Sequence, residues 1–250
     1  MKNWETLEPD VYRIMNKHYT PGRGGRSIRY IVRHHTAGVL TTEQVWNVWQ
    51  TRQASANYIV EPSGRIGQLV NDWDTSWANA NATANAESIT IEHSNSAGSG
   101  QDWPISDATI EEGAHLAAAI CRAYNLGRPE FGKNIKDHRD FWNTSCPYHL
   151  ARGGKYHQRY MDRAQYWFDQ MTKNPAPTPA PAPKEDDMAA DLNTIITTDT
   201  GEKHRAQDLI KWTDGRVYEL TREGGTLDEM RQAQERIETK LDALLNKKES

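Results

Sequence analysis

The sequence predicts an α/β protein in which helices cover a central β-sheet. The first 173 residues mix short β-branched runs with longer amphipathic segments, a combination typical of this fold class. A Pro-rich stretch then separates a small C-terminal module that ends in a predicted helix. A chain of 250 residues has room for one medium-sized domain with such an appendage.

Three segments of the first part are predicted to be extended. Residues 28–36, IRYIVRHHT, alternate and are rich in β-branched side chains, as strands are. Residues 56–70 contain two short apolar runs around a Pro-Ser-Gly turn, which is typical of a hairpin. Residues 88–94, SITIEHS, form a further strand that places Ile89 on one face and Glu92 on the other.

Three longer segments are predicted to be helical. The first covers residues 41–53, with Val45, Val48 and Trp49 on a shared apolar face. The second covers residues 107–125, and a glycine just beyond its end is a common helix terminator. The last covers residues 155–171.

Residues 174–187 are predicted to be a Pro/Ala-rich linker, because alternating prolines favour an extended conformation that cannot pack into a core. At about 3.1 Å per residue such a spacer would reach roughly 30 Å. The predicted domains are therefore 1–173 and 188–250. Within the second, a helix is predicted at 203–212, and residues 227–245 repeat apolar side chains at heptad-like spacing. This last helix is expected either to pack on its own module or to self-associate.

Charge and cysteine content exclude several classes of protein. A net charge of −4 offers no electrostatic footprint for nucleic acid. No apolar run reaches the ~20 residues of a membrane span, and the first residues do not resemble a signal peptide, so we expect a soluble chain made in the cytoplasm. Two cysteines are too few for a disulfide scaffold. Cys121 lies in a predicted helix and is expected to be a core residue, which leaves Cys146 to be explained.

A metal site would explain Cys146. His138 lies eight residues before it, and a catalytic zinc takes three protein ligands and keeps one position for water. The third ligand could be His34 or His35, which are adjacent on a predicted strand. Neighbouring strand residues point to opposite faces, so only one of the two can reach the site, and the alternation alone does not say which.

The segments YIVRHHTAG, SITIEHSN and DHRDFWNTSCP, in this order, resemble the zinc N-acetylmuramoyl-L-alanine amidases of the Amidase_2 type. These include phage endolysins and the peptidoglycan-recognition proteins. The resemblance covers roughly residues 28–171. It implies a mixed central β-sheet flanked by helices, and a zinc ion (Zn2+) held by His34, His138 and Cys146 on the floor of a groove.

The resemblance also implies roles for further residues. Glu92 matches the glutamate that serves one branch of the family as general base; another branch uses a tyrosine, and here that position is Ala56. Thr144 stands where some relatives carry a lysine that supports the oxyanion, and a local loop hydrogen bond is the alternative for its hydroxyl. Trp77 and Asn79, in the loop before the glutamate strand, are expected to contact the sugar or the stem peptide, with loop anchoring as the alternative for the tryptophan.

The implied function is that of an endolysin, which cleaves the amide between N-acetylmuramic acid and L-alanine in bacterial peptidoglycan and lyses the host wall after release through holin pores. A bacterial autolysin or a virion-associated lysin remain alternatives. A non-catalytic peptidoglycan-binding protein on the same fold is a further alternative, although such proteins usually lose the cysteine ligand. A structural zinc site would need a fourth ligand, and the sequence offers no convincing one.

The C-terminal module is expected to bind the cell wall or to assemble the protein. Met188 follows Lys184 and Glu185, whose codons can form a purine-rich ribosome-binding sequence. This arrangement suggests that a shorter C-terminal product starting at Met188 is also made. Such a product could associate with the full-length chain through residues 227–245.

Overall fold

The structure is a computed structural model that describes residues 7–173, 195–197 and 203–205. The chain divides into two units, Met1–Ala176 and Pro177–Ser250. In the second unit, β9 (Ile195–Thr197) and β10 (Lys203–Arg205) form an antiparallel pair. The helix predicted from Lys203 is therefore wrong at its first three residues, which pair with β9. The linker, the 227–245 helix and Met188 lie outside the described residues.

The first unit is built on a six-stranded mixed sheet with the order β1-β5-β4-β7-β3-β8, as the α/β prediction requires. β3 runs parallel to β7 and β8, β7 runs parallel to β4, and β4 and β5 form the predicted antiparallel hairpin. A separate small sheet pairs β2 with β6. The strand bounds are β1 Val11–Tyr12, β2 Tyr19–Thr20, β3 Tyr30–His35, β4 Tyr58–Val60, β5 Ile66–Gln68, β6 Thr75–Ser76, β7 Ser88–His93 and β8 Ile135–Asp137.

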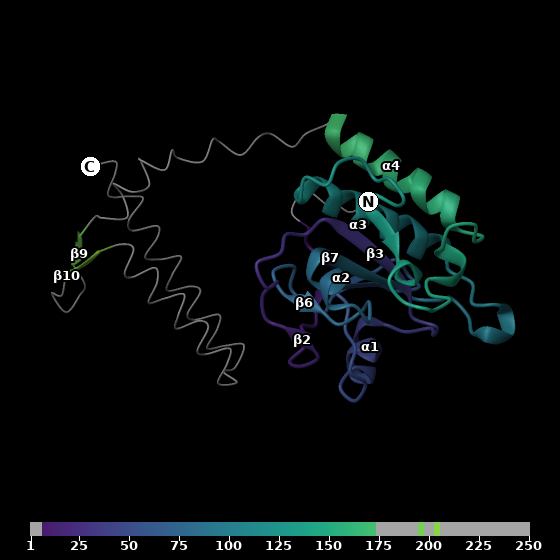
Figure 1. Ribbon diagram of the computed structural model, residues 1–250, viewed down its shortest axis with the longest axis horizontal. Helices are drawn as coiled ribbons and strands as arrows, with labels where there is room; N and C mark the ends of the chain where they lie inside the picture. The colour runs from purple at the N-terminus through teal and green to yellow at the C-terminus, as the bar shows by residue number, and fades with distance from the viewer. Residues whose placement is uncertain (1–6, 174–194, 198–202, 206–250) are drawn as a thin grey trace. The chain divides into compact units, whose positions relative to one another are not determined.

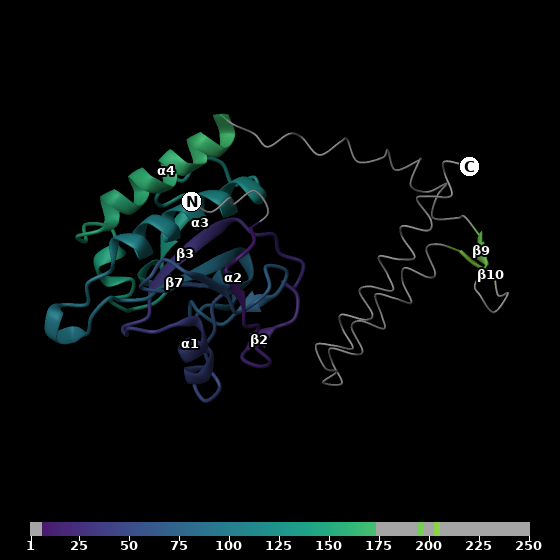
Figure 2. The ribbon, with the colours of Figure 1, turned by 180° about the vertical axis from the view of Figure 1, so that it is seen from behind.

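Helices cover both faces of the six-stranded sheet. On one face α3 (Asp107–Ala123) packs against β3 and β7, and α4 (His157–Lys173) packs on α3 (Figures 1 and 2). The opposite face is covered by α1 (Thr42–Val48), and α2 (Ala82–Glu87) leads directly into β7. Within residues 7–173 the single-turn 3-10 helices are η1 Ser99–Gln101, η2 His138–Asp140 and η3 Tyr148–Leu150. Among the described residues, no helix is long and apolar enough to cross a membrane.

The alternation of each central strand separates two apolar clusters. Ile31, Ile89 and Ile91 point towards α3, where they pack with its buried residues. Ile59 and Leu69 point the other way and pack with Val45 and Trp49 of the α1 region. Because β3 and β7 are in register, the next residues along each strand also share faces, and these residues include the candidate ligands.

The helix predictions were close, with two differences. Val48 was expected on the buried face of the first helix but is 41% exposed, whereas Val45 and Trp49 are buried. Val45 and Trp49 are one helical turn apart, and Val48 is rotated by roughly 100° from its neighbour Trp49. The second difference is α2, which lies in a segment expected to be a loop and is capped by the side chain of Asn81.

Candidate metal centre and active site

The site lies at the carboxyl ends of three parallel strands. His34 of β3 is in register with Glu92 of β7, and His138 follows directly after β8 on the other side of β3. Parallel strands present their carboxyl ends at the same edge of a sheet, so three segments that are distant in sequence meet there. The loop after η2 returns Cys146 to this edge, where the Sγ of Cys146 accepts a hydrogen bond from the backbone N–H of His35 at 3.4 Å.

Three potential metal ligands converge at this edge. One ligand atom each from His34, His138 and Cys146 lies within 4.8 Å of the other two. The Sγ of Cys146 is 3.7 Å from Nδ1 of His34, and the two imidazole rings are 4.4 Å apart. Nε2 of His138 is buried and has no hydrogen-bond partner among the described groups. Zinc prefers imidazole nitrogen and thiolate sulfur as ligands. The cluster offers two imidazoles and a thiol, and Nε2 of His138 is not engaged by another described group.

His35 points away from this cluster. Its Nδ1 lies 3.2 Å from Oδ1 of Asn95, and its ring stacks on Tyr148 at 5.8 Å. The structure thus separates the two adjacent histidines, which the sequence alone left as alternatives. His34 is the one that faces His138 and Cys146.

The surroundings favour the unprotonated histidines that metal binding requires. Burial, and then the neighbouring His138, hold the pKa of His34 well below its usual value. Burial also lowers the pKa of His138. In the metal-free protein, burial and the nearby Glu92 raise the pKa of the Cys146 thiol well above its usual value. A bound cation would reverse that preference, because a coordinating thiol is deprotonated.

Asn79 fixes the tautomer of His34. Its Oδ1 lies 3.0 Å from Nε2 of His34, and its Nδ2 donates to Oγ of Ser88, which identifies Oδ1 as the acceptor. Nε2 of His34 therefore carries the proton, and the bare Nδ1 faces Cys146. Asn79 was expected to contact substrate, but its side chain is fully buried behind the ligand and has no exposed surface.

Glu92 lies on the same face of the sheet as His34. The residue is half-buried, and its Oε2 is buried without a hydrogen-bond partner in the described part of the chain. Burial raises the pKa of Glu92 to about 7, and the positive charge of Arg52 opposes this rise. Glu92 is in register with His34 across the β3–β7 pair, next to the ligand cluster. A carboxylate with a pKa near neutrality and a free oxygen is suited to accept and release a proton.

The remaining expected residues make local contacts or are buried. Oγ1 of Thr144 accepts a hydrogen bond from the backbone N–H of Cys146 at 3.2 Å, which is a local loop contact. Trp77 is 38% exposed, and its Nε1 donates to Oγ1 of Thr20 across the β2–β6 pair. Ala56 is fully buried and brings no hydroxyl to the site.

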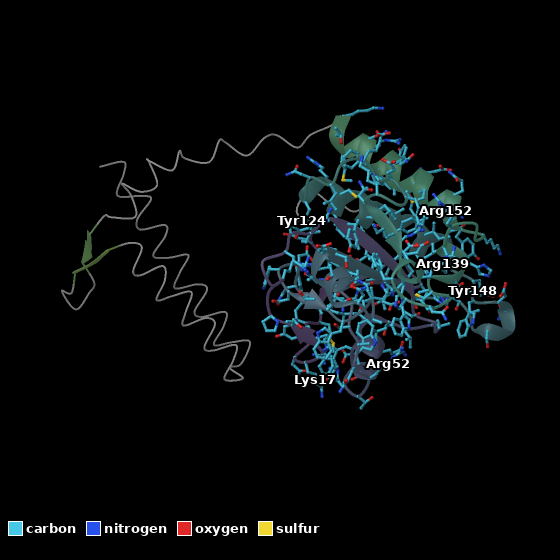
Figure 3. The ribbon with its side chains drawn as sticks, in the orientation of Figure 1. Lys17, Arg52, Tyr124, Arg139, Tyr148 and Arg152 are labelled. Atoms are coloured by element: carbon cyan, nitrogen blue, oxygen red, sulfur yellow. The ribbon has the colours of Figure 1, made fainter. Side chains whose placement is uncertain are left out.

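Two charged groups near the site were not anticipated. Arg52, labelled in Figure 3, lies in the turn after α1, and its charge acts on Glu92. Nη2 of Arg139 donates to the carbonyl oxygen of Arg152, and these two arginines lie on the same side of the view as Tyr148. Arg139 also holds the ligand loop, because its backbone N–H donates to the carbonyl oxygen of Cys146.

Comparisons with solved structures support the fold. Solved structures with the same fold include PlyL (19% identity, 64% of this chain and 99% of that chain covered, TM-score 0.52). They also include the PlyG catalytic domain (17% identity, 68% and 99% covered, TM-score 0.51). A third is the Staphylococcus aureus hydrolase AmiA in complex with its ligand (17% identity, 67% and 87% covered, TM-score 0.52). No curated protein matches the sequence significantly.

The sequence match to a family is more specific than the likeness in fold. Residues 24–149, half of the chain, match the Amidase_2 family, described as N-acetylmuramoyl-L-alanine amidase. This span contains His34, Glu92, His138 and Cys146, the four residues that the fold brings to one edge of the sheet. The chain therefore belongs to the Amidase_2 family of N-acetylmuramoyl-L-alanine amidases.

Proposed function

We propose that this protein is a zinc-dependent peptidoglycan amidase of the endolysin type, which hydrolyses the amide between N-acetylmuramic acid and the L-alanine of the stem peptide. The observation that carries the proposal is the convergence of two neutral histidines and a cysteine next to a half-buried carboxylate. Hydrolysis of an amide at neutral pH needs an activated water, a stabilised oxyanion and a group that moves protons. The site has a candidate for each.

His34, His138 and Cys146 would hold the metal. Bound there, zinc would lower the pKa of a water molecule to about 7 and polarise the scissile carbonyl. Two neutral imidazoles and one thiolate leave a divalent cation with net positive charge, so the site would keep its Lewis acidity. Three protein ligands rather than four also fit a catalytic site better than a structural one.

Glu92 would act as the general base and then as the general acid. Its free Oε2 would take a proton from the attacking water and hand it to the departing nitrogen of L-alanine. The burial that raises its pKa to about 7 lets the same carboxylate perform both transfers near neutral pH.

Two further residues, Thr144 and Trp77, would assist. The hydroxyl of Thr144 accepts from the backbone of Cys146, so its own hydrogen remains available for the oxyanion. Trp77 presents a partly exposed aromatic side chain in the segment before α2, where it would contact the sugar or the stem peptide. Asn79 would act behind the metal rather than on the substrate, through its contact with His34.

We further propose that the enzyme lyses the bacterial host cell wall after release through holin pores, with residues 188–250 as a wall-binding or oligomerisation module. A bacterial autolysin or a virion-associated lysin would use the same chemistry. A non-catalytic peptidoglycan-binding protein is the alternative of a different class. The complete set of three ligands together with Glu92 argues against it.

The first experiment measures zinc content and release of new N-terminal L-alanine from purified cell walls, on the wild type and on Cys146→Ala. We expect about one zinc per chain, with zinc and activity both lost in the variant. Cys121→Ala is the matched control, because Cys121 is fully buried in α3 and belongs to the apolar core. Zinc binding without L-alanine release would favour the binding protein, and absence of zinc would refute the proposal.

A further inference from the structure

We infer that a buried ion pair, Arg33–Asp137, is a positioning device for the metal ligands; this inference rests on the proposed zinc site. Arg33 directly precedes His34 on β3, and Asp137 directly precedes His138 at the end of β8. The two residues are in register across the parallel pair, and both side chains are completely buried. Nε and Nη2 of the guanidinium both donate to Oδ1 of Asp137, at 2.9 and 2.7 Å.

The Asp137 carboxylate touches all three ligand-bearing segments. Through Arg33 it is bound to the strand of His34. It also caps η2, the single turn that begins with His138, and there the backbone N–H of Asp137 donates to Asp140 in return. Its Oδ2 accepts from the backbone N–H of Arg152, in the segment that follows Cys146. One side chain therefore fixes the relative positions of the segments that carry the three ligands.

The pair lies on the face of the sheet opposite the ligands, where α4 covers it. Nη2 of Arg33 lies 3.1 Å from Nδ1 of His157. The guanidinium also lies over the rings of Tyr160 and Phe131, at 5.0 and 5.4 Å. This enclosure keeps the arginine in one position, so the contact with Asp137 has little freedom.

Stability alone does not explain such a pair. Removing two charges from water costs about as much as their attraction returns, and apolar residues of similar volume often serve as well. Nη1 of Arg33 even lacks a hydrogen-bond partner among the described groups, which adds to the cost. What apolar residues would not supply is the carboxylate that Arg33, η2 and Arg152 share. Groups that orient metal ligands in this way typically change metal affinity by about 10–100-fold when they are lost.

The test compares zinc affinity in full-length variants by competition with a chromogenic chelator. The double variant Arg33→Met/Asp137→Leu removes both charges without leaving one unpaired, and it is expected to fold. Asp137→Asn keeps the shape of the side chain but loses the charge. We expect both variants to bind zinc about 10–100-fold more weakly than the wild type. The visible spectrum of the cobalt-substituted double variant should also change, because its ligands are displaced.

Arg163→Met is the matched control, since it breaks the half-buried pair with Glu111 between α3 and α4, away from the ligand strands. It should lower the melting temperature and leave the zinc affinity unchanged. The inference would be overturned if the double variant kept the zinc affinity and cobalt spectrum of the wild type, or if the control lost as much affinity. Absence of zinc from the wild type would overturn both this inference and the proposed function.

Discussion

Glu92 is the residue on which the proposed chemistry depends most directly. Its buried oxygen has no partner in the described part of the chain, and its pKa of about 7 is the consequence of burial. Glu92→Gln keeps the size of the side chain and removes the base. We expect the rate of L-alanine release to fall by about 10²–10⁴-fold while zinc content stays unchanged. Glu43→Gln is the control, because Glu43 is paired with Arg13 and fully outside the site.

Asn79 provides a second test at single-residue scale, because the two roles considered for it predict different kinetics. As an orienting group for His34, its loss in Asn79→Ala should weaken zinc binding by about 10–100-fold. Asn79→Asp retains an acceptor oxygen for Nε2 and should restore much of the affinity. An unchanged zinc affinity combined with a raised KM on a soluble muropeptide would instead make Asn79 a substrate contact.

Among the elements, the contact between α3 and β7 depends on a glycine. A Cβ at Gly113 would lie 2.6 Å from Nε2 of His93, which is buried on β7. Nδ1 of His93 lies 2.8 Å from the carbonyl oxygen of His34, so the packing of α3 reaches the backbone of a ligand. The close approach of helix and strand at this point is possible only without a side chain.

Gly113→Ala therefore has two opposing effects. Helix propensity alone would stabilise α3 by about 1 kcal/mol. The clash with His93 and the buried Tyr160 should cost about 1–3 kcal/mol. We expect a net loss of stability, measured as a lower midpoint of urea unfolding. Gly98→Ala should be neutral, because a Cβ there meets nothing within 4 Å and its φ of −84° suits alanine. A rise in the Gly113→Ala midpoint would show that the core can yield at this point.

Across the molecule, the sequence predicted local structure better than it predicted partners. The alternation at 28–36 and 88–94 identified β3 and β7, because Ile31 of β3 and Ile89 and Ile91 of β7 are buried against α3. It could not choose between His34 and His35, since that choice depends on which face of the sheet carries the site. The structure places His34, and not His35, in a cluster with His138 and Cys146, on the face that carries Glu92.

Contacts between distant segments could not be predicted either, because they also depend on how the strands are placed in the sheet. Asn79 lies 45 residues from its partner His34, and Arg33 lies 104 residues from Asp137. Neither pair has a signal in composition or periodicity, because an arginine in a strand is as compatible with a solvent-exposed face as with a buried ion pair. The motifs indicated the candidate ligands, and the fold was needed to find the groups that contact their strands.

The division into Met1–Ala176 and Pro177–Ser250 predicts how activity is distributed over the whole chain. The match to the Amidase_2 family and all four site residues belong to the first unit. A fragment of residues 1–176 should therefore keep its zinc and hydrolyse a soluble muropeptide with an unchanged kcat/KM. If the second unit binds the wall, the fragment should be slower than the full chain on intact cell walls. The reason is that tethering raises the effective substrate concentration, and the gain in avidity reaches about 10²–10⁴-fold in favourable cases.

The comparison of the two substrates separates the roles proposed for residues 188–250. If the fragment were slower than the full chain on intact walls but not on the soluble muropeptide, wall binding by the second unit would be supported. If the fragment and the full chain had equal rates on each substrate, assembly would be the favoured role of the second unit. Sedimentation of the full chain and of a Met188→Leu variant would then test assembly, because the substitution removes the start of any shorter product. A single full-length band from the unaltered gene would rule that product out. A fragment that lost activity on the soluble muropeptide as well would show that the second unit completes the catalytic domain, contrary to the predicted domain boundary.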